Sequence, residues 1–214
     1  MSDIFDEVDE ELRRDNVAKL WARYGKYVIA LAVLVVLATG GVVQWQRYQL
    51  HQREDEEARY AAALTLAQQG KDKDAAEAFA LIAREAGGGH ATLARLEAAA
   101  IEARSGDVDG AIAAYDAIAT DATMDPIYRD VARLVWAQLS LKGGDPQTII
   151  AKLAPLTAAD NPWHPSALEL TALAQLKAGN KAEARAIYER LAADLGSPQS
   201  LRTRAGEMIT ALAE

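Results

Sequence analysis

The sequence contains no cysteine, only two phenylalanines, six prolines and three histidines among its 214 residues. The lack of cysteine excludes a disulfide scaffold, a cysteine nucleophile, an iron–sulfur centre and a thiolate zinc site. Lysine and arginine number 23 against 31 acidic residues, for a net charge of −8. The chain therefore has no basic surplus with which to neutralise phosphates, which argues against a nucleic-acid partner. With 46 alanines and few aromatics, the composition favours closely packed helices over sheets.

One long apolar run lies near the N-terminus. Residues 27–46 carry no charge and are bracketed by Lys26 and Arg47. As a helix they would span about 30 Å, which is the thickness of the hydrocarbon core of a bilayer. The run predicts a transmembrane helix, with interfacial aromatics at both ends: Trp21, Tyr24, Tyr27, Trp45 and Tyr48. A cleaved signal peptide is the alternative, but the long acidic segment before the run favours an uncleaved anchor.

The flanking charges predict the orientation of this anchor. Residues 12–26 contain five cations and residues 47–61 contain three, so the positive-inside rule places residues 1–26 in the cytoplasm and 47–214 across the membrane. Residues 1–26 combine an acidic head with an amphipathic lead-in. The head is either a contact for a basic cytoplasmic surface or a solvated tail.

A repeat of 35 to 38 residues organises the chain after the anchor. Four glycine-led segments follow one another at spacings of 36, 38 and 35 residues. In each, an alanine stands seven places before the glycine, a bulky residue nine places after it and a large aliphatic residue twelve places after it. Each unit therefore predicts two helices joined by a glycine turn, with alanine where the two backbones approach closely. The defining residues are Ala63, Gly70, Phe79, Ala99, Gly106, Tyr115, Ala137, Gly144, Leu153, Ala172, Gly179 and Tyr188.

The turn residues agree with this division into units. Asp125–Pro126, Asp145–Pro146 and Ser197–Pro198 each place a capping side chain before a proline, which is typical of a helix start. We expect an all-α domain whose last helix has no partner and caps the stack. The expected helices span residues 48–69, 72–86, 90–105, 108–120, 126–142, 146–157, 165–178, 181–195 and 198–213.

The units resemble the tetratricopeptide repeat, most closely around Gly70, Gly106 and Gly179 and less closely around Gly144. The resemblance implies a right-handed α-solenoid of about four helix pairs plus a C-terminal capping helix. An ordinary alanine-rich helical bundle is the alternative. The domain organisation is thus a cytoplasmic head and lead-in at 1–26, a transmembrane helix at 27–46 and a tetratricopeptide-repeat-like domain at 47–214.

No catalytic constellation is visible in the sequence. His51, His90 and His164 are far apart, and the triple glycine at 87–89 lacks the lysine and hydroxyl of a phosphate-binding loop. We therefore expect no enzyme, no cofactor and no metal. Three arginines, each eleven places before a turn glycine, are candidates for a partner groove: Arg59, Arg95 and Arg133. They either form a cationic ladder for client carboxylates or lie on the solvent side with their stems packed down.

The order of elements, an acidic head, a lead-in, one membrane helix and alanine-rich repeats, is similar to that of the YfgM family. That resemblance implies an ancillary subunit of the bacterial Sec translocon, held in the inner membrane as a single-pass protein with its repeats in the periplasm. The implied partners are the SecYEG channel, a membrane-bound periplasmic chaperone of the prolyl-isomerase type and newly translocated client polypeptides. An envelope-assembly scaffold, in cell division or cytochrome maturation, and an anchored enzyme with an unrecognised site are the alternatives.

Overall fold

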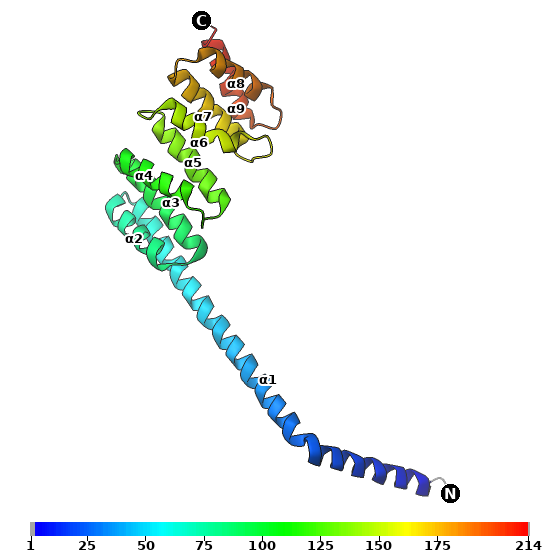
Figure 1. The fold of residues 1–214 in the computed structure, drawn as a ribbon. Helices are drawn as coiled ribbons and strands as arrows, with labels where there is room; N and C mark the ends of the chain where they lie inside the picture. The colour runs from blue at the N-terminus through cyan, green and yellow to red at the C-terminus, as the bar shows by residue number, and fades with distance from the viewer. Residues whose placement is uncertain (1–2, 214) are drawn as a thin grey trace. The chain divides into compact units, whose positions relative to one another are not determined.

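The computed structural model describes the backbone of residues 3–213 and the side chains of residues 21–213 except Val28, Ala30 and Ala32. Over the described backbone the chain forms nine α-helices and one 3-10 helix, without any strand (Figure 1). The expected all-α fold is therefore confirmed for these residues. The elements are α1 (Asp3–Gln68), α2 (Asp72–Glu85), α3 (Gly88–Ser105), α4 (Val108–Thr120), α5 (Pro126–Ser140), α6 (Pro146–Leu153), η1 (Ala154–Thr157), α7 (His164–Lys177), α8 (Lys181–Ala193) and α9 (Gln199–Ala211).

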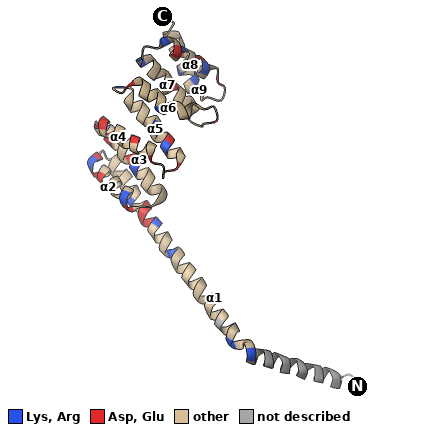
Figure 2. Cartoon of the chain, in the orientation of Figure 1, with Lys and Arg blue, Asp and Glu red and all other residues tan. Residues whose placement is uncertain are grey.

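Contacts divide the chain into an N-terminal part, Met1–Asp55, and a C-terminal part, Glu56–Glu214, and helix α1 runs through the boundary. In the N-terminal part, the large apolar side chains that the structure describes are exposed. Residues 27–46, in the middle of α1, carry no charge (Figure 2). Among the described residues, no helix has an apolar stretch long enough to cross a membrane. Three residues of the predicted span, Val28, Ala30 and Ala32, lie outside the described side chains, as do the head and most of the lead-in at 1–20.

The C-terminal part is a stack of helix pairs, and each pair is one repeat unit. The end of α1 pairs with α2, and the pairs α3/α4, α5/α6 and α7/α8 follow, with α9 packed on α8. Three hydrophobic clusters hold the stack together: one joins α1, α2 and α3, the next extends from α3 to α7, and the last joins α7, α8 and α9. Each pair thus shares its core with the following pair, as expected of a solenoid.

Burial follows the repeat spacing of the sequence. The alanine seven places before each turn glycine has an exposed fraction of 0% in all four units. Because alanine adds only a methyl group, the helix that carries it can approach its neighbour closely. The bulky residue nine places after each glycine is also buried, and these residues fill the core: Phe79, Tyr115, Leu153 and Tyr188.

Helix boundaries agree with the sequence predictions within two residues, apart from two elements. The expected first helix at 48–69 is the end of α1, which begins at Asp3. The expected helix at 146–157 divides at Leu153 into α6 and η1, because Pro155 has no N–H with which to continue the α-helical hydrogen bonds.

Two of the three expected proline-linked caps are confirmed. The side chain of Asp125 accepts a hydrogen bond from the Ile127 N–H at 2.9 Å, and that of Asp145 accepts one from the Thr148 N–H at 2.8 Å. The expected Ser197 cap is wrong, because Pro198 occupies the capping position of α9 and makes no side-chain cap bond. The buried Ser197 hydroxyl donates instead to Asp194 Oδ2 at 2.6 Å.

The turn glycines are of two kinds. Gly70, Gly106 and Gly179 adopt left-handed φ values of 73°, 95° and 83°, which suit glycine because it has no Cβ. The φ of Gly144 is not positive, and its N–H donates to the Ser140 carbonyl at 2.7 Å. A Cβ on Gly144 would lie 2.8 Å from that same oxygen. The third turn is therefore built differently, in the unit where the repeat pattern is weakest.

Candidate interaction site

Two of the predicted groove arginines form the same ion pair in successive units. Arg59 Nη2 lies 2.6 Å from Glu85 Oε2, and Arg95 Nη1 lies 2.7 Å from Asp121 Oδ2. Both acids stand fifteen places after their turn glycine, at or just beyond the end of the second helix. The pair therefore links the first helix of a unit to the end of the second.

The pair is not continued in the third and fourth units. The acid position of the third unit is Ala159, and Arg133 instead contacts Asp130 Oδ1 at 2.9 Å and donates to the Ala119 carbonyl at 3.4 Å. In the fourth unit the arginine position is Leu168. The structure thus gives each of the three arginines an acidic partner within the chain, and their predicted contact with a client stays a prediction.

Hydrogen bonding lowers the pKa of Asp121 to about 2. The Thr123 hydroxyl is the main cause, followed by Arg95 and then by the Thr123 N–H. The hydroxyl donates to Asp121 Oδ1 at 2.6 Å, and the N–H donates to the same oxygen at 3.0 Å. All three bonds favour the ionised carboxylate, so this acid is a fixed charge in the link between α3 and the end of α4.

A second set of cations lies at the boundaries between successive repeat units, which we call seams. Arg104, Lys142 and Lys177 each stand two places before a turn glycine. Arg104 Nη2 reaches back to Asp72 Oδ1 of the preceding unit at 2.6 Å. Lys177 Nζ donates to two carbonyls of the preceding turn, at 2.9 Å and 2.6 Å. Lys142 forms no ion pair or hydrogen bond with any side chain or carbonyl that the structure describes.

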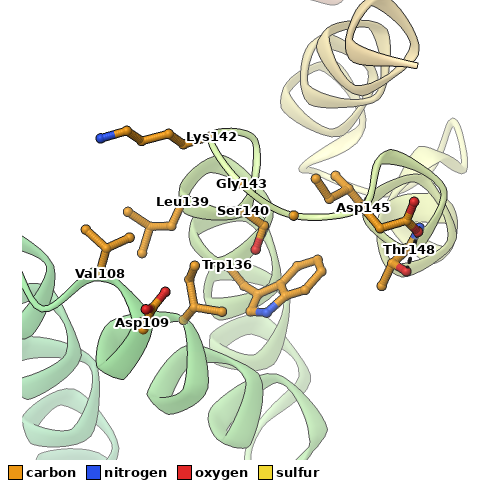
Figure 3. A pocket seen from close by; sticks show the side chains of 12 residues that line it. Val108, Asp109, Trp136, Leu139, Ser140, Lys142, Gly143, Asp145 and Thr148 are labelled. Carbon is orange, nitrogen blue, oxygen red and sulfur yellow. Dashed lines mark hydrogen bonds between the residues drawn. The ribbon is translucent and has the colours of Figure 1, made fainter.

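Beside Lys142 the seam opens into a cleft of about 710 Å³ (Figure 3). The cleft lies among the N-terminal ends of α4 and α6 and the C-terminal end of α5. Its apolar lining consists of Val108, Ile112, Trp136, Leu139 and Ile149. Its polar rim consists of Asp109, Ser140, Lys142, Asp145 and Thr148. The cleft was not predicted from the sequence, because its lining residues flank the turns and lie mostly outside the helix-packing positions that define the repeat.

A three-residue contact fixes Trp136 in the wall of the cleft. Lys152 Nζ lies 4.2 Å from the centre of the Trp136 ring, and the same ammonium pairs with Asp116. These residues come from α6, α5 and α4, so the contact also joins the second unit to the third. Because cation–π contacts and packing both restrict the ring, the wall is formed before any partner arrives.

Not all rim groups are free to bind. Asp145 accepts bonds from both the N–H and the hydroxyl of Thr148, and these bonds lower the pKa of the Asp145 carboxyl. The rim charges left over are therefore Lys142 and Asp109, both of which are exposed. Figure 3 shows them on opposite sides of Val108 and Leu139.

The histidines lie at three separate places. His51 Nδ1 is 3.2 Å from Glu54 Oε2, His90 Nδ1 is 3.4 Å from Glu56 Oε2, and His164 Nδ1 is 2.8 Å from the Thr157 carbonyl. Over the part of the chain that the structure describes, no three histidine or acidic side chains are grouped as metal ligands.

The aromatics predicted at the membrane interface lie on α1, and all five are exposed: Trp21, Tyr24, Tyr27, Trp45 and Tyr48. Basic side chains accompany two of them. The Arg23 guanidinium is 5.7 Å from the centre of the Tyr24 ring, and Lys26 Nζ is 5.1 Å from that of Tyr27. Their contact with a lipid headgroup layer stays a prediction.

Comparison with known proteins gives a family and a fold. The family model of the tetratricopeptide repeat-like domain matches residues 18–208. Among solved structures, the chain is similar to the nearly identical TPR-like repeats of a putative kinesin light chain from Podosopora anserina and to a single-substitution variant of those repeats. Both are 16% identical, with TM-scores of 0.55 and 0.57, and both alignments cover 73% of this chain and 84% of the other. No curated protein matches the chain.

Proposed function

Because the chain belongs to the tetratricopeptide repeat-like domain family, we propose that it is a non-catalytic protein–protein interaction module held at a membrane by residues 27–46. Domains of this family are generally scaffolds that bind protein partners. The stacked helix pairs of the C-terminal part supply extended surfaces suited to a peptide or a partner helix. The observation that carries the anchor is the exposed apolar surface of α1.

That surface surrounds the helix. Leu34, Val35, Val36 and Leu37 are consecutive, so steps of 100° between them send their side chains to different sides, and each is more than half exposed. A helix that is apolar all round needs a non-aqueous cover along its length. A bilayer is the cover that fits the charge-free run of residues 27–46 and the aromatics at its two ends.

We place residues 1–26 in the cytoplasm and the repeats in the periplasm of a bacterium, with the chain as a single-pass protein of the inner membrane. The surplus of cations before the apolar run supports this orientation. Similarity of the element order to the YfgM family supports the partners, namely the SecYEG translocon and a membrane-bound periplasmic chaperone acting on newly translocated proteins.

Protease accessibility tests the topology. In right-side-out vesicles added protease should digest the repeats, and in inverted vesicles it should remove only the N-terminal head. Digestion in the opposite pattern, or a mature chain that lacks its head, would contradict the proposed anchor and orientation.

A pair of lysines within the run tests the anchor itself. Each lysine at the centre of a membrane helix costs roughly 2.5 to 3.5 kcal/mol, so V35K/V36K should release the chain from washed membranes. The matched control Q49K/Q52K adds the same two charges to exposed positions of the same helix, beyond the run, and should stay membrane-bound. Equal retention of both variants would refute a bilayer-spanning segment.

Co-purification in mild detergent tests the partners. The full chain should recover the translocon or an associated chaperone. Recovery of cell-division or cytochrome-maturation proteins in their place would redirect the function to envelope assembly.

We further propose that Arg59, Arg95 and Arg133, here called the arginine ladder, contact the carboxylates of clients. The variant R59A/R95A/R133A should then lose partners that a control, R185A, retains. Arg185 is also ion-paired, with Glu189, but lies outside the ladder.

A further inference from the structure

We propose that the cleft formed by α4, α5 and α6 is a binding site for a protein segment that presents an apolar side chain next to a carboxylate. The inference rests on the proposed interaction function and adds to it a second site. This site is distinct from the arginine ladder, because its lining comes from the ends of α4, α5 and α6 and includes none of the three arginines.

Equivalent seams along the stack differ in how their cation is paired. At the seam between the first and second units, the cation Arg104 is paired with Asp72, which stands two places after the preceding turn glycine. At the next seam the same two positions hold Lys142 and Val108. The acid that closes the first seam is thus replaced by an apolar side chain, and the cation has no partner among the described residues.

The following seam shows that a lysine at this position can be satisfied internally. Lys177 bridges the carbonyls of Leu141 and Gly144 across the seam between the third and fourth units. Lys142 makes no such bridge within the described residues, although it occupies the same position in its unit. The seam between the second and third units is therefore the one that is left with both an open cleft and an uncommitted ammonium.

The cleft has the size and the apolar lining of a binding site. A volume of about 710 Å³ falls within the range of roughly 300 to 1,000 Å³ that is usual for clefts that bind small ligands. Trp136 forms one wall and is held by Lys152, while Val108, Ile112 and Leu139 supply aliphatic surface. Such a lining selects an apolar side chain, since burying it removes apolar surface from water on both partners.

The charges at the rim favour an acidic group on one side of the cleft. The Lys142 ammonium at the rim provides hydrogen-bond donors only, so its complement is an acceptor, and an ionised carboxylate makes the strongest bond of this kind. Asp109 lies on the opposite side of the aliphatic lining in Figure 3, so it would disfavour a carboxylate placed there. The rim therefore orients a bound segment with its acidic group toward Lys142.

Fluorescence anisotropy with the full chain in mild detergent tests the proposal. The probe is a fluorescein-labelled decapeptide of glycine and serine with a central phenylalanine flanked by glutamates. One matched peptide replaces the glutamates by lysines, and another replaces the phenylalanine by alanine. Loss of the phenylalanine should weaken binding by about 30-fold, and the lysine peptide should bind more weakly than the glutamate peptide.

Two variants of the protein separate the cleft from other surfaces. K142A should weaken the glutamate peptide by about fivefold and should bind the lysine peptide at least as well as the unmodified chain does, because a like charge is removed. V108D recreates the acid of the first seam opposite Lys142 and should weaken binding more than the neutral control V108N, with an unaltered far-UV circular dichroism spectrum. D109N should bind the glutamate peptide at least as well as the unmodified chain.

The outcomes decide the proposal independently of the proposed function. Unchanged binding by K142A and V108D, or equal binding of the two charged peptides, overturns the site. So does binding of dodecanoate that depends on Lys142 while none of the peptides binds, because the occupant is then a lipid. A chain that recovers the translocon but binds no peptide keeps its function without this site, whereas peptide binding without translocon recovery keeps the site and removes that partner.

Discussion

The buried alanines of the repeats make the substitution Ala99→Leu a direct test of how the units close. Ala99 lies in α3 with an exposed fraction of 0% and belongs to the cluster that joins α3 to α7. The added carbons of leucine have no free space at such a position. Forcing extra methylenes into a packed core costs about 1 to 3 kcal/mol, because neighbouring side chains leave their rotamers or the helices separate.

For a domain of this size, 1 kcal/mol shifts the melting temperature by about 2 to 4 °C, so a cost of about 1 to 3 kcal/mol means that A99L should lower it by roughly 2 to 12 °C. Thermal unfolding of the full chain followed by circular dichroism measures the shift. The matched control is A113L, the same replacement at an exposed position of α4, which should change the melting temperature little. Equal melting temperatures for the two variants would refute the argument that alanine is required for close helix approach.

Two further substitutions test the turns and the ion pair. Gly106→Ala places a Cβ at a φ of 95° and should destabilise the chain by about 1 kcal/mol in urea unfolding, whereas Gly143→Ala, at a φ that is not positive, should cost less. Because the pKa of Asp121 is depressed to about 2, its ionisation stabilises the fold above the unfolded pKa near 4, and this contribution is lost as the pH falls through 2. D121N should therefore be less stable than the unmodified chain at pH 6, and the difference should shrink from about pH 4 downward and vanish below pH 2. A difference that is independent of pH would show that Thr123 and Arg95 do not act through the charge.

The helices were predictable because their signals are local. The repeat spacing, the turn glycines and the caps at Asp125 and Asp145 each depend on residues that are neighbours in the chain. The two local errors also have local reasons. Pro155 ends α6 early by removing a hydrogen-bond donor, and Ser197 is drawn into a bond with Asp194 in place of capping α9.

The candidate site was only partly predictable. The arginine positions follow from the spacing of the turns, but their pairing with Glu85 and Asp121 depends on how each second helix folds back on the first. The cleft depends on still more distant contacts, since its walls come from two different units.

The sequence by itself determined the helical class, the position of each repeat and the charge-free run along α1, because each of these is a pattern of neighbouring residues. Only the tertiary structure decided which charges are satisfied. Arg104, Lys142 and Lys177 occupy the same position of their units in the sequence. Two of them reach partners in the preceding unit and Lys142 reaches none among the described residues, because a partner's identity is set by what the stacking of one unit on the next brings within hydrogen-bond distance.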